Sequence, residues 1–172
     1  TIFLLRKMKE IVNFGALKSI YYALFHSNMS YAIVLWGNSP LSITIFRLQK
    51  RALRVMLGLG CREHCRLFFI ENNILTLPCI FIYFTVIEIH SNRSDMIHQY
   101  HIHKYNTRTA DLVRTRRFRL TKTKNLSINI SLYNHLPQRY RTLCGSAFKT
   151  KVKKLLLRHA FYSTNEFLEY KF

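Results

Sequence analysis

The chemistry this chain could carry lies in its cations, and four of them are spaced as neighbours on one helix face. Residues at i, i+3, i+4 and i+7 lie above one another on an α-helix, and the cations at this spacing are Arg47, Lys50, Arg51 and Arg54. Such a row suits a phosphate backbone, although a solvated helix face is the alternative. No carboxylate lies between Glu10 and Glu63 to neutralise the 47–54 row, which favours phosphate contact.

Two further groups of cations follow along the chain. The first is a basic tract that includes Phe118, and its cations are Arg114, Arg116, Arg117, Arg119, Lys122 and Lys124. Such tracts bind nucleic acid or direct nuclear import, and a flexible solubilising linker is an equally weighted alternative. The second group spans residues 149–158, from which we take Lys149 and Lys153 as nucleic-acid-binding residues.

Acidic and thiol side chains give no comparable signal for catalysis or metal binding. Two-metal phosphoryl transfer needs carboxylates that converge on Mg²⁺, and Glu166 and Glu169 are the one close acidic pair. Cys61, His64 and Cys65 lack the second ligand pair that zinc fingers supply, so we interpret the cysteines as packing thiols. We therefore predict no catalytic residue, no metal site and no cofactor, in a chain that holds nucleic acid without acting on it.

Composition sets the class of protein and of partner. Among 172 residues, 27 Lys and Arg against 8 Asp and Glu leave a formal charge of +19, which fits RNA, DNA or an anionic membrane surface, the membrane ranking last. A hydrophobic content of 49% provides for a packed core, and the low counts of 5 Gly and 3 Pro favour helices. We expect reduced cysteines, no signal peptide, and a nuclear or cytoplasmic protein that is not secreted.

Apolar periodicity predicts a mainly α fold. We expect helices at residues 4–12, capped near 13–15, and at 17–26, 30–36, 41–57, 62–70 and 76–90. The last of these contains the most apolar run, which is shorter than the ~20 residues of a membrane-spanning helix and reads as buried. Beyond Ser91 we expect an irregular basic segment, a short strand at 126–130, a turn at 132–136, a strong helix around 148–158 and a turn at 164–170. The predicted core side of the 41–57 helix is Ile45, Leu48, Ala52, Val55 and Met56.

A series of short motifs, in this order, resembles one protein family. The motifs are YALFHS at 22–27, SY at 30–31, LWGNS at 35–39, LQKRALR at 48–54, NILTLPC at 73–79, YNTR at 105–108, FRLTKT at 118–123, LYNHLP at 132–137, FK at 148–149, FYS at 161–163 and NEFL at 165–168. They resemble the region after the catalytic palm in reverse transcriptases of non-LTR, Jockey-like retrotransposons. Ala32 stands where the family leads us to expect glycine, and the stretch at 125–130 is short against its usual spacing.

The resemblance implies the thumb of an RNA-directed DNA polymerase with its C-terminal extension. It implies a helical thumb-like domain at residues 1–91, a basic linker at 92–130 and a C-terminal helical extension at 131–172. The implied partners are the RNA–DNA template–primer duplex and upstream polymerase domains, whose palm would hold Mg²⁺. Asp95 and Asp111 are isolated, so no catalytic aspartate carries over and the segment is not expected to be an enzyme on its own. We expect it to be the tail of a longer protein; a free-standing basic nucleic-acid-binding protein and a transposon relic without function are the alternatives.

Overall fold

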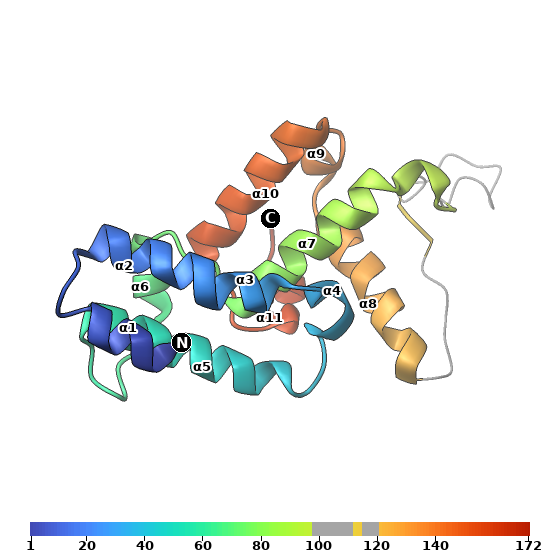
Figure 1. The fold of residues 1–172 in the computed structure, drawn as a ribbon. Helices are drawn as coiled ribbons and strands as arrows, with labels where there is room; N and C mark the ends of the chain where they lie inside the picture. Colours follow the sequence, from blue (N-terminus) through green and yellow to red (C-terminus); the bar gives the residue numbers. More distant parts are fainter. Residues whose placement is uncertain (98–111, 115–120) are drawn as a thin grey trace. The chain divides into compact units, whose positions relative to one another are not determined.

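The computed structural model describes residues 1–97, 112–114 and 121–172, with the backbone alone for residues 121–126. Most of these described residues lie in helices and none of them in a strand, which confirms the mainly α class (Figure 1). They form two compact units, one of Thr1–Phe81 with Leu156–Tyr162 and one of Ile82–Leu155 with Ser163–Phe172. The predicted domain limits at residues 91 and 130 stay predictions.

The first unit consists of helices, most of them short. They are α1 (Ile2–Met8), α2 (Phe14–Tyr21), the π-helix η1 (Tyr22–His26), α3 (Ser27–Ser30), α4 (Ile33–Trp36), α5 (Ser42–Leu57), α6 (Arg66–Glu71) and the start of α7 (Leu77–Ser91). The predicted C-cap near residues 13–15 is wrong, because Asn13 begins a helix. Its side-chain oxygen accepts a hydrogen bond from the Ala16 N–H at 2.9 Å, which makes Asn13 the N-cap of α2.

Helix α5 packs against α1 and α2 and provides much of the first unit's core (Figure 1). Its buried residues are Phe46, Gln49, Ala52, Leu53 and Met56. The predicted core side is therefore right at Ala52 and Met56 and wrong at Leu48, which is 42% exposed. The buried face is rotated from the predicted one because a polar residue, Gln49, lies at its centre.

Gln49 is fully buried and makes three hydrogen bonds that join separate segments. Its amide nitrogen donates to the Tyr21 hydroxyl at 2.9 Å and to the Leu75 carbonyl at 2.8 Å. Its amide oxygen accepts from the Leu77 N–H at 2.8 Å, at the first turn of α7. Because each polar atom of the side chain has a partner, the cost of burying the amide is offset. The bonds fix α2, α5 and the start of α7 within the first unit.

The segment before α5 differs most from expectation. Residues 30–36 were predicted to form a buried helix, but α4 is one turn long, Tyr31 and Leu35 are each 80% exposed, and only Ile33 is buried in it. The turn begins at Ala32, whose φ of 48° lies in the left-handed region that glycine tolerates best. Gly37 ends it close to Phe81, where an added Cβ would lie 2.6 Å from a ring carbon.

The predicted helix limits around residues 57–77 are mostly correct. Gly58, at φ 74°, caps α5 as expected, whereas α6 begins four residues later than predicted. The Thr76 hydroxyl accepts from the Cys79 N–H at 3.3 Å, which confirms Thr76 as a capping residue of α7. Among the described helices, α7 included, none combines the length and apolar character that crossing a bilayer demands.

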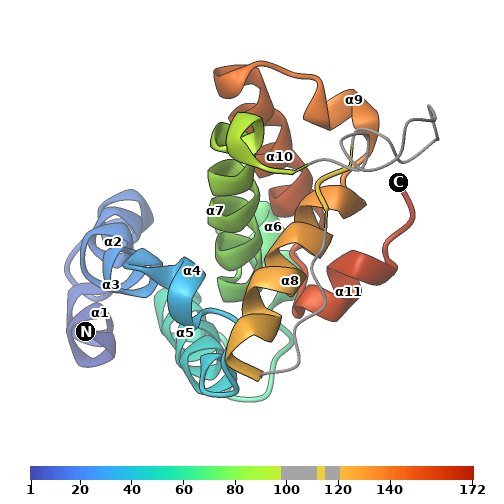
Figure 2. The ribbon, with the colours of Figure 1, turned by 90° about the vertical axis from the view of Figure 1, so that its right-hand side faces the viewer.

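The second unit contains the rest of α7, the 3₁₀ turn η2 (Arg93–Asp95), α8 (Thr121–His135), α9 (Gln138–Arg141), most of α10 (Gly145–His159) and α11 (Thr164–Glu169). Helices α8 and α11 lie side by side (Figure 2). His90 of α7 stacks on Phe148 of α10 with ring centroids 3.8 Å apart, and its ring nitrogens face the Tyr133 hydroxyl and the Leu143 carbonyl. This buried histidine joins three segments of the unit.

The predicted strand at residues 126–130 is wrong, and the chain is helical rather than irregular from Thr121. The buried residues Ile130, Tyr133 and Leu136 recur every third position, a helical spacing that five residues are too few to display. The predicted turn at 132–136 is the end of α8. The predicted helix around 148–158 is confirmed as α10, and the turn at 164–170 is α11, with Ser163 as its N-cap.

Candidate nucleic-acid interface

The 47–54 row lies on the side of α5 that faces away from the core. Arg47 and Arg51 are exposed, whereas Lys50 and Arg54 are half-buried at the edge of the same face. No member of the row is buried, because the opposite side of the helix carries the core residues. This placement leaves the cations on the surface, as phosphate contact requires.

Arg54 is tied to the loop after α5. Its Nε and one terminal nitrogen both donate to the Glu63 carbonyl, at 3.1 and 2.7 Å. The Glu63 carboxylate in turn accepts from the Gly60 N–H at 2.7 Å, so the loop is folded onto the helix. Arg54 thus helps to hold the loop, which makes it a poorer site for a purely functional substitution than Arg47 or Arg51.

Lys50 is held by aromatic rings. Its ammonium nitrogen lies 4.8 Å from the centroid of the Phe46 ring and 5.5 Å from that of Tyr162. Arg66 lies over the same Tyr162 ring, with its guanidinium carbon 4.5 Å from the centroid. Neither Arg66 nor Tyr162 was among the predicted site residues, since their proximity to Lys50 depends on three segments far apart in the sequence. We call Lys50, Arg66 and Tyr162 the Tyr162 cluster.

Helix α10 carries further exposed cations, within the second unit. Lys149 and Lys153, both predicted, are exposed, and so are Lys151 and Lys154, whereas Phe148 and Val152 are buried. Lys149 and Lys153 are four residues apart and share one side of α10, whereas Lys151 and Lys154 are three residues apart and lie on another side. Lys151 also lies over the Tyr140 ring, with its nitrogen 5.7 Å from the centroid.

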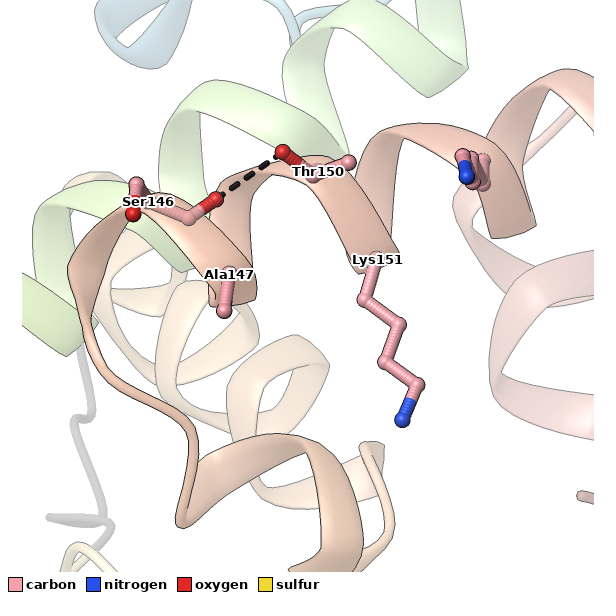
Figure 3. Close-up of a pocket in the computed structure, with 5 residues that line it drawn as sticks. Ser146, Ala147, Thr150 and Lys151 are labelled. Carbon is pink, nitrogen blue, oxygen red and sulfur yellow. Dashed lines mark hydrogen bonds between the residues drawn. The ribbon is translucent and has the colours of Figure 1, made fainter.

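A shallow hollow of about 460 Å³ lies on the side of α10 that carries Lys151 and Lys154 (Figure 3). The residues that line it are Ser146, Ala147, Thr150, Lys151 and Lys154. The Thr150 hydroxyl donates to the Ser146 carbonyl at 3.0 Å, while the Lys151 side chain extends away from the helix. The hollow is therefore an open depression whose exposed surface is mostly apolar, with the two lysines among its lining residues.

The basic tract is described only in part. Arg114 is exposed, and its backbone N–H donates to the Ile97 carbonyl at 2.8 Å. The predicted site residues Arg116 and Arg117 lie outside the described residues, as do the side chains of Lys122 and Lys124. The role of the tract stays a prediction.

The cysteine and histidine candidates are not gathered into a metal site. Cys61 and His64 are exposed, whereas the Cys65 thiol is buried and donates to the Glu63 carbonyl at 3.6 Å. Burial raises the pKa of the Cys65 thiol, and the nearby Arg54 and Lys50 cations act in the opposite direction. In the part of the chain that the structure describes, no three His, Cys, Asp or Glu side chains come together as a metal would need. The absence of a cofactor stays a prediction.

Comparison with known proteins finds no match for this chain. No protein-family model matches the chain, no curated protein matches its sequence and no solved structure matches its fold. Conclusions about function therefore depend on the motifs of the sequence and on the geometry of the cationic faces.

Proposed function

We propose that this chain binds RNA and DNA non-specifically through the phosphate backbone, as the thumb and following region of a Jockey-like, non-LTR reverse transcriptase. In this role the cations of α5 in the first unit and the lysines of α10 in the second unit each contact the backbone of the template–primer duplex. The upstream polymerase domains supply the palm, its Mg²⁺ and the chemistry. The segment itself polymerises nothing. The proposed site comprises the 47–54 row, Arg114, Arg116 and Arg117 of the basic tract, and Lys149 and Lys153.

The observation that carries the proposal is the one-sided placement of cations on α5. Arg47 and Arg51 point away from a face whose buried residues include Phe46 and Leu53, so their charge is available to a ligand. The 27 Lys and Arg of the chain outnumber its 8 Asp and Glu, and this maintains a positive field around Arg47 and Arg51. Contacts of this kind release condensed counterions, and they position a duplex without reading its sequence.

The Arg47→Glu/Arg51→Glu variant tests the proposal. Binding of a fluorescein-labelled DNA duplex is measured by anisotropy at several KCl concentrations, for two unrelated sequences. Each lost phosphate contact reduces the slope of log affinity against log salt by about 0.9 on B-form duplex, so the slope should fall by about 1.8. Both sequences should be bound equally by the wild-type chain.

Arg6→Glu/Lys7→Glu is the matched control, because both residues are exposed on α1 of the same unit and the net charge changes equally. The control should retain most of the wild-type slope, and far-UV circular dichroism should show unchanged helicity in both variants. Equal losses in the two variants would mean that α5 acts only through net charge. A wild-type chain that fails to bind duplex at low salt would refute the function itself.

A further inference from the structure

The Tyr162 cluster brings together residues from three segments of the first unit. Lys50 comes from α5, Arg66 begins α6, and Tyr162 follows α10. Both cations lie over one ring, with their charged groups 5.5 and 4.5 Å from its centroid. Since both distances are measured to the same point, the two charges are no more than about 10 Å apart.

Buried aromatic side chains hold the central ring in place. Phe46 meets Tyr162 edge to face at 5.0 Å between centroids and 86° between planes, and Phe69 does so at 6.5 Å and 86°. Phe46 is 5% exposed and Phe69 is fully buried. Tyr162 is therefore anchored in the core on one side while it remains half-buried beneath the two cations.

Two like charges at this separation repel each other, and the negative face of an aromatic ring offsets part of that repulsion. The residual positive potential is reduced further when an anion binds. A nucleic-acid strand carries one phosphate for every ~3.4 Å of helix axis, so two cations up to about 10 Å apart can each contact a phosphate of the same strand. The cluster is therefore compatible with the backbone of a nucleic acid, the partner proposed above.

The Arg66 guanidinium lies close to the Tyr162 ring, with its carbon 4.5 Å from the ring centroid. A guanidinium uses its flat face against a ring and its edge N–H groups against phosphate oxygens, so the two contacts do not compete. Contact with the Tyr162 ring restricts the long Lys50 and Arg66 side chains in the folded protein, which lowers the entropy lost when they bind. Arg66 is exposed, so a backbone can reach it.

We propose that the Tyr162 cluster is a phosphate-binding anchor for the nucleic-acid backbone, in which Lys50 and Arg66 contact phosphates and Tyr162 positions both. The inference rests on the proposed function and extends the interface from α5 onto α6. It adds one contact residue, Arg66, and one positioning residue, Tyr162, to those expected from the sequence.

The test compares Arg66→Gln with Arg62→Gln in the full chain, using the labelled DNA duplex and the salt series. Arg62 is also exposed and lies four residues earlier, outside the described helices. Arg66→Gln should reduce the slope of log affinity against log salt by about 0.9, and Arg62→Gln should leave it near the wild-type value. Tyr162→Phe, which keeps the ring, should bind as the wild type does.

Three outcomes would overturn the inference. Equal salt slopes for Arg66→Gln and Arg62→Gln, in a wild-type background that binds duplex, would refute the anchor and leave the proposed function standing. If Arg66→Gln weakens binding to vesicles of anionic phospholipid but leaves duplex binding unchanged, Arg66 would be assigned to a membrane surface instead. Absence of duplex binding by the wild type would overturn both proposals. Tyr162→Leu tests the positioning role, provided that its far-UV circular dichroism matches that of the wild type. A reduction of the salt slope equal to that of Arg66→Gln supports this role.

Discussion

Replacing Gln49 with methionine separates hydrogen bonding from packing in the core of the first unit. Methionine has nearly the same length and volume as glutamine, so the change leaves little cavity. It removes the partners of the Tyr21 hydroxyl, the Leu75 carbonyl and the Leu77 N–H. The Leu75 carbonyl and the Leu77 N–H belong to the backbone, so the substitution leaves both buried without their hydrogen-bond partner.

The expected loss follows from those three groups. A buried donor or acceptor left without a partner costs about 1–3 kcal/mol. Even at the lower end for each group, Gln49→Met should reduce the free energy of unfolding of the first unit by about 3 kcal/mol. That is a large fraction of the ~5–15 kcal/mol that stabilises a typical domain.

Leu48→Ala provides the matched comparison one residue away. Apolar periodicity places Leu48 in the core, where truncation to alanine would cost about 2–5 kcal/mol. In the structure Leu48 is 42% exposed, so a loss below about 1 kcal/mol is expected instead. The sequence pattern therefore predicts a greater loss of stability for Leu48→Ala than for Gln49→Met, and the structure predicts the opposite.

Urea unfolding followed by Trp36 fluorescence measures both variants. Trp36 is the single tryptophan of the chain and lies in the first unit, so its signal reports that unit. The dependence of the unfolding free energy on urea should be unchanged, because similar surface becomes exposed in each variant. A greater loss for Leu48→Ala than for Gln49→Met would refute the assigned role of Gln49.

Two further predictions concern backbone strain and pH. Ala32→Gly should raise the free energy of unfolding by about 0.5–1 kcal/mol in the Trp36 assay, because φ at this position is 48° and alanine is strained there; a loss of stability would contradict this account. Burial lowers the pKa of His90, with a smaller contribution from the Arg93 charge, so the unfolded state binds the proton more readily and stability should fall as pH drops below about 6.5. His90→Phe should be less stable than the wild type at pH 7.5, but its free energy of unfolding should fall less between pH 7.5 and pH 5.5, as measured by urea unfolding with far-UV circular dichroism. A pH dependence equal to that of the wild type would exclude His90 as the source of the stability loss at low pH.

Helices with many residues and clear end signals were predictable from sequence. Helix α5 has a long amphipathic pattern and ends at Gly58, and α7 begins after the capping residue Thr76. The strand predicted at residues 126–130 failed because alternation over five residues also occurs within a helix. A longer window that included Tyr133 and Leu136 carries the helical period.

Features that depend on long-range contacts could not be predicted in the same way. A buried glutamine reads as a surface residue until its partners Tyr21, Leu75 and Leu77 are placed around it. The exposed side of α5 was predicted correctly as cationic, because an unpaired charge is too costly to bury. Which cations are held by other groups was not predictable, since Tyr162 and Glu63 reach Lys50 and Arg54 only in the folded unit.

The cations of the first unit therefore differ in how they would act on a duplex. Arg47 and Arg51 are exposed, so binding must order their side chains and salt must screen them readily. Lys50 and Arg66 are already ordered on the Tyr162 ring, so more of their attraction for phosphate remains as affinity. Counterion release treats each contact alike, and the salt slope therefore counts contacts, whereas the affinity at a fixed salt concentration reflects how well each contact is prepared. If that distinction holds, Arg66→Gln should lose more affinity for each unit of slope than Arg47→Gln/Arg51→Gln does, a comparison in which each substitution removes one positive charge.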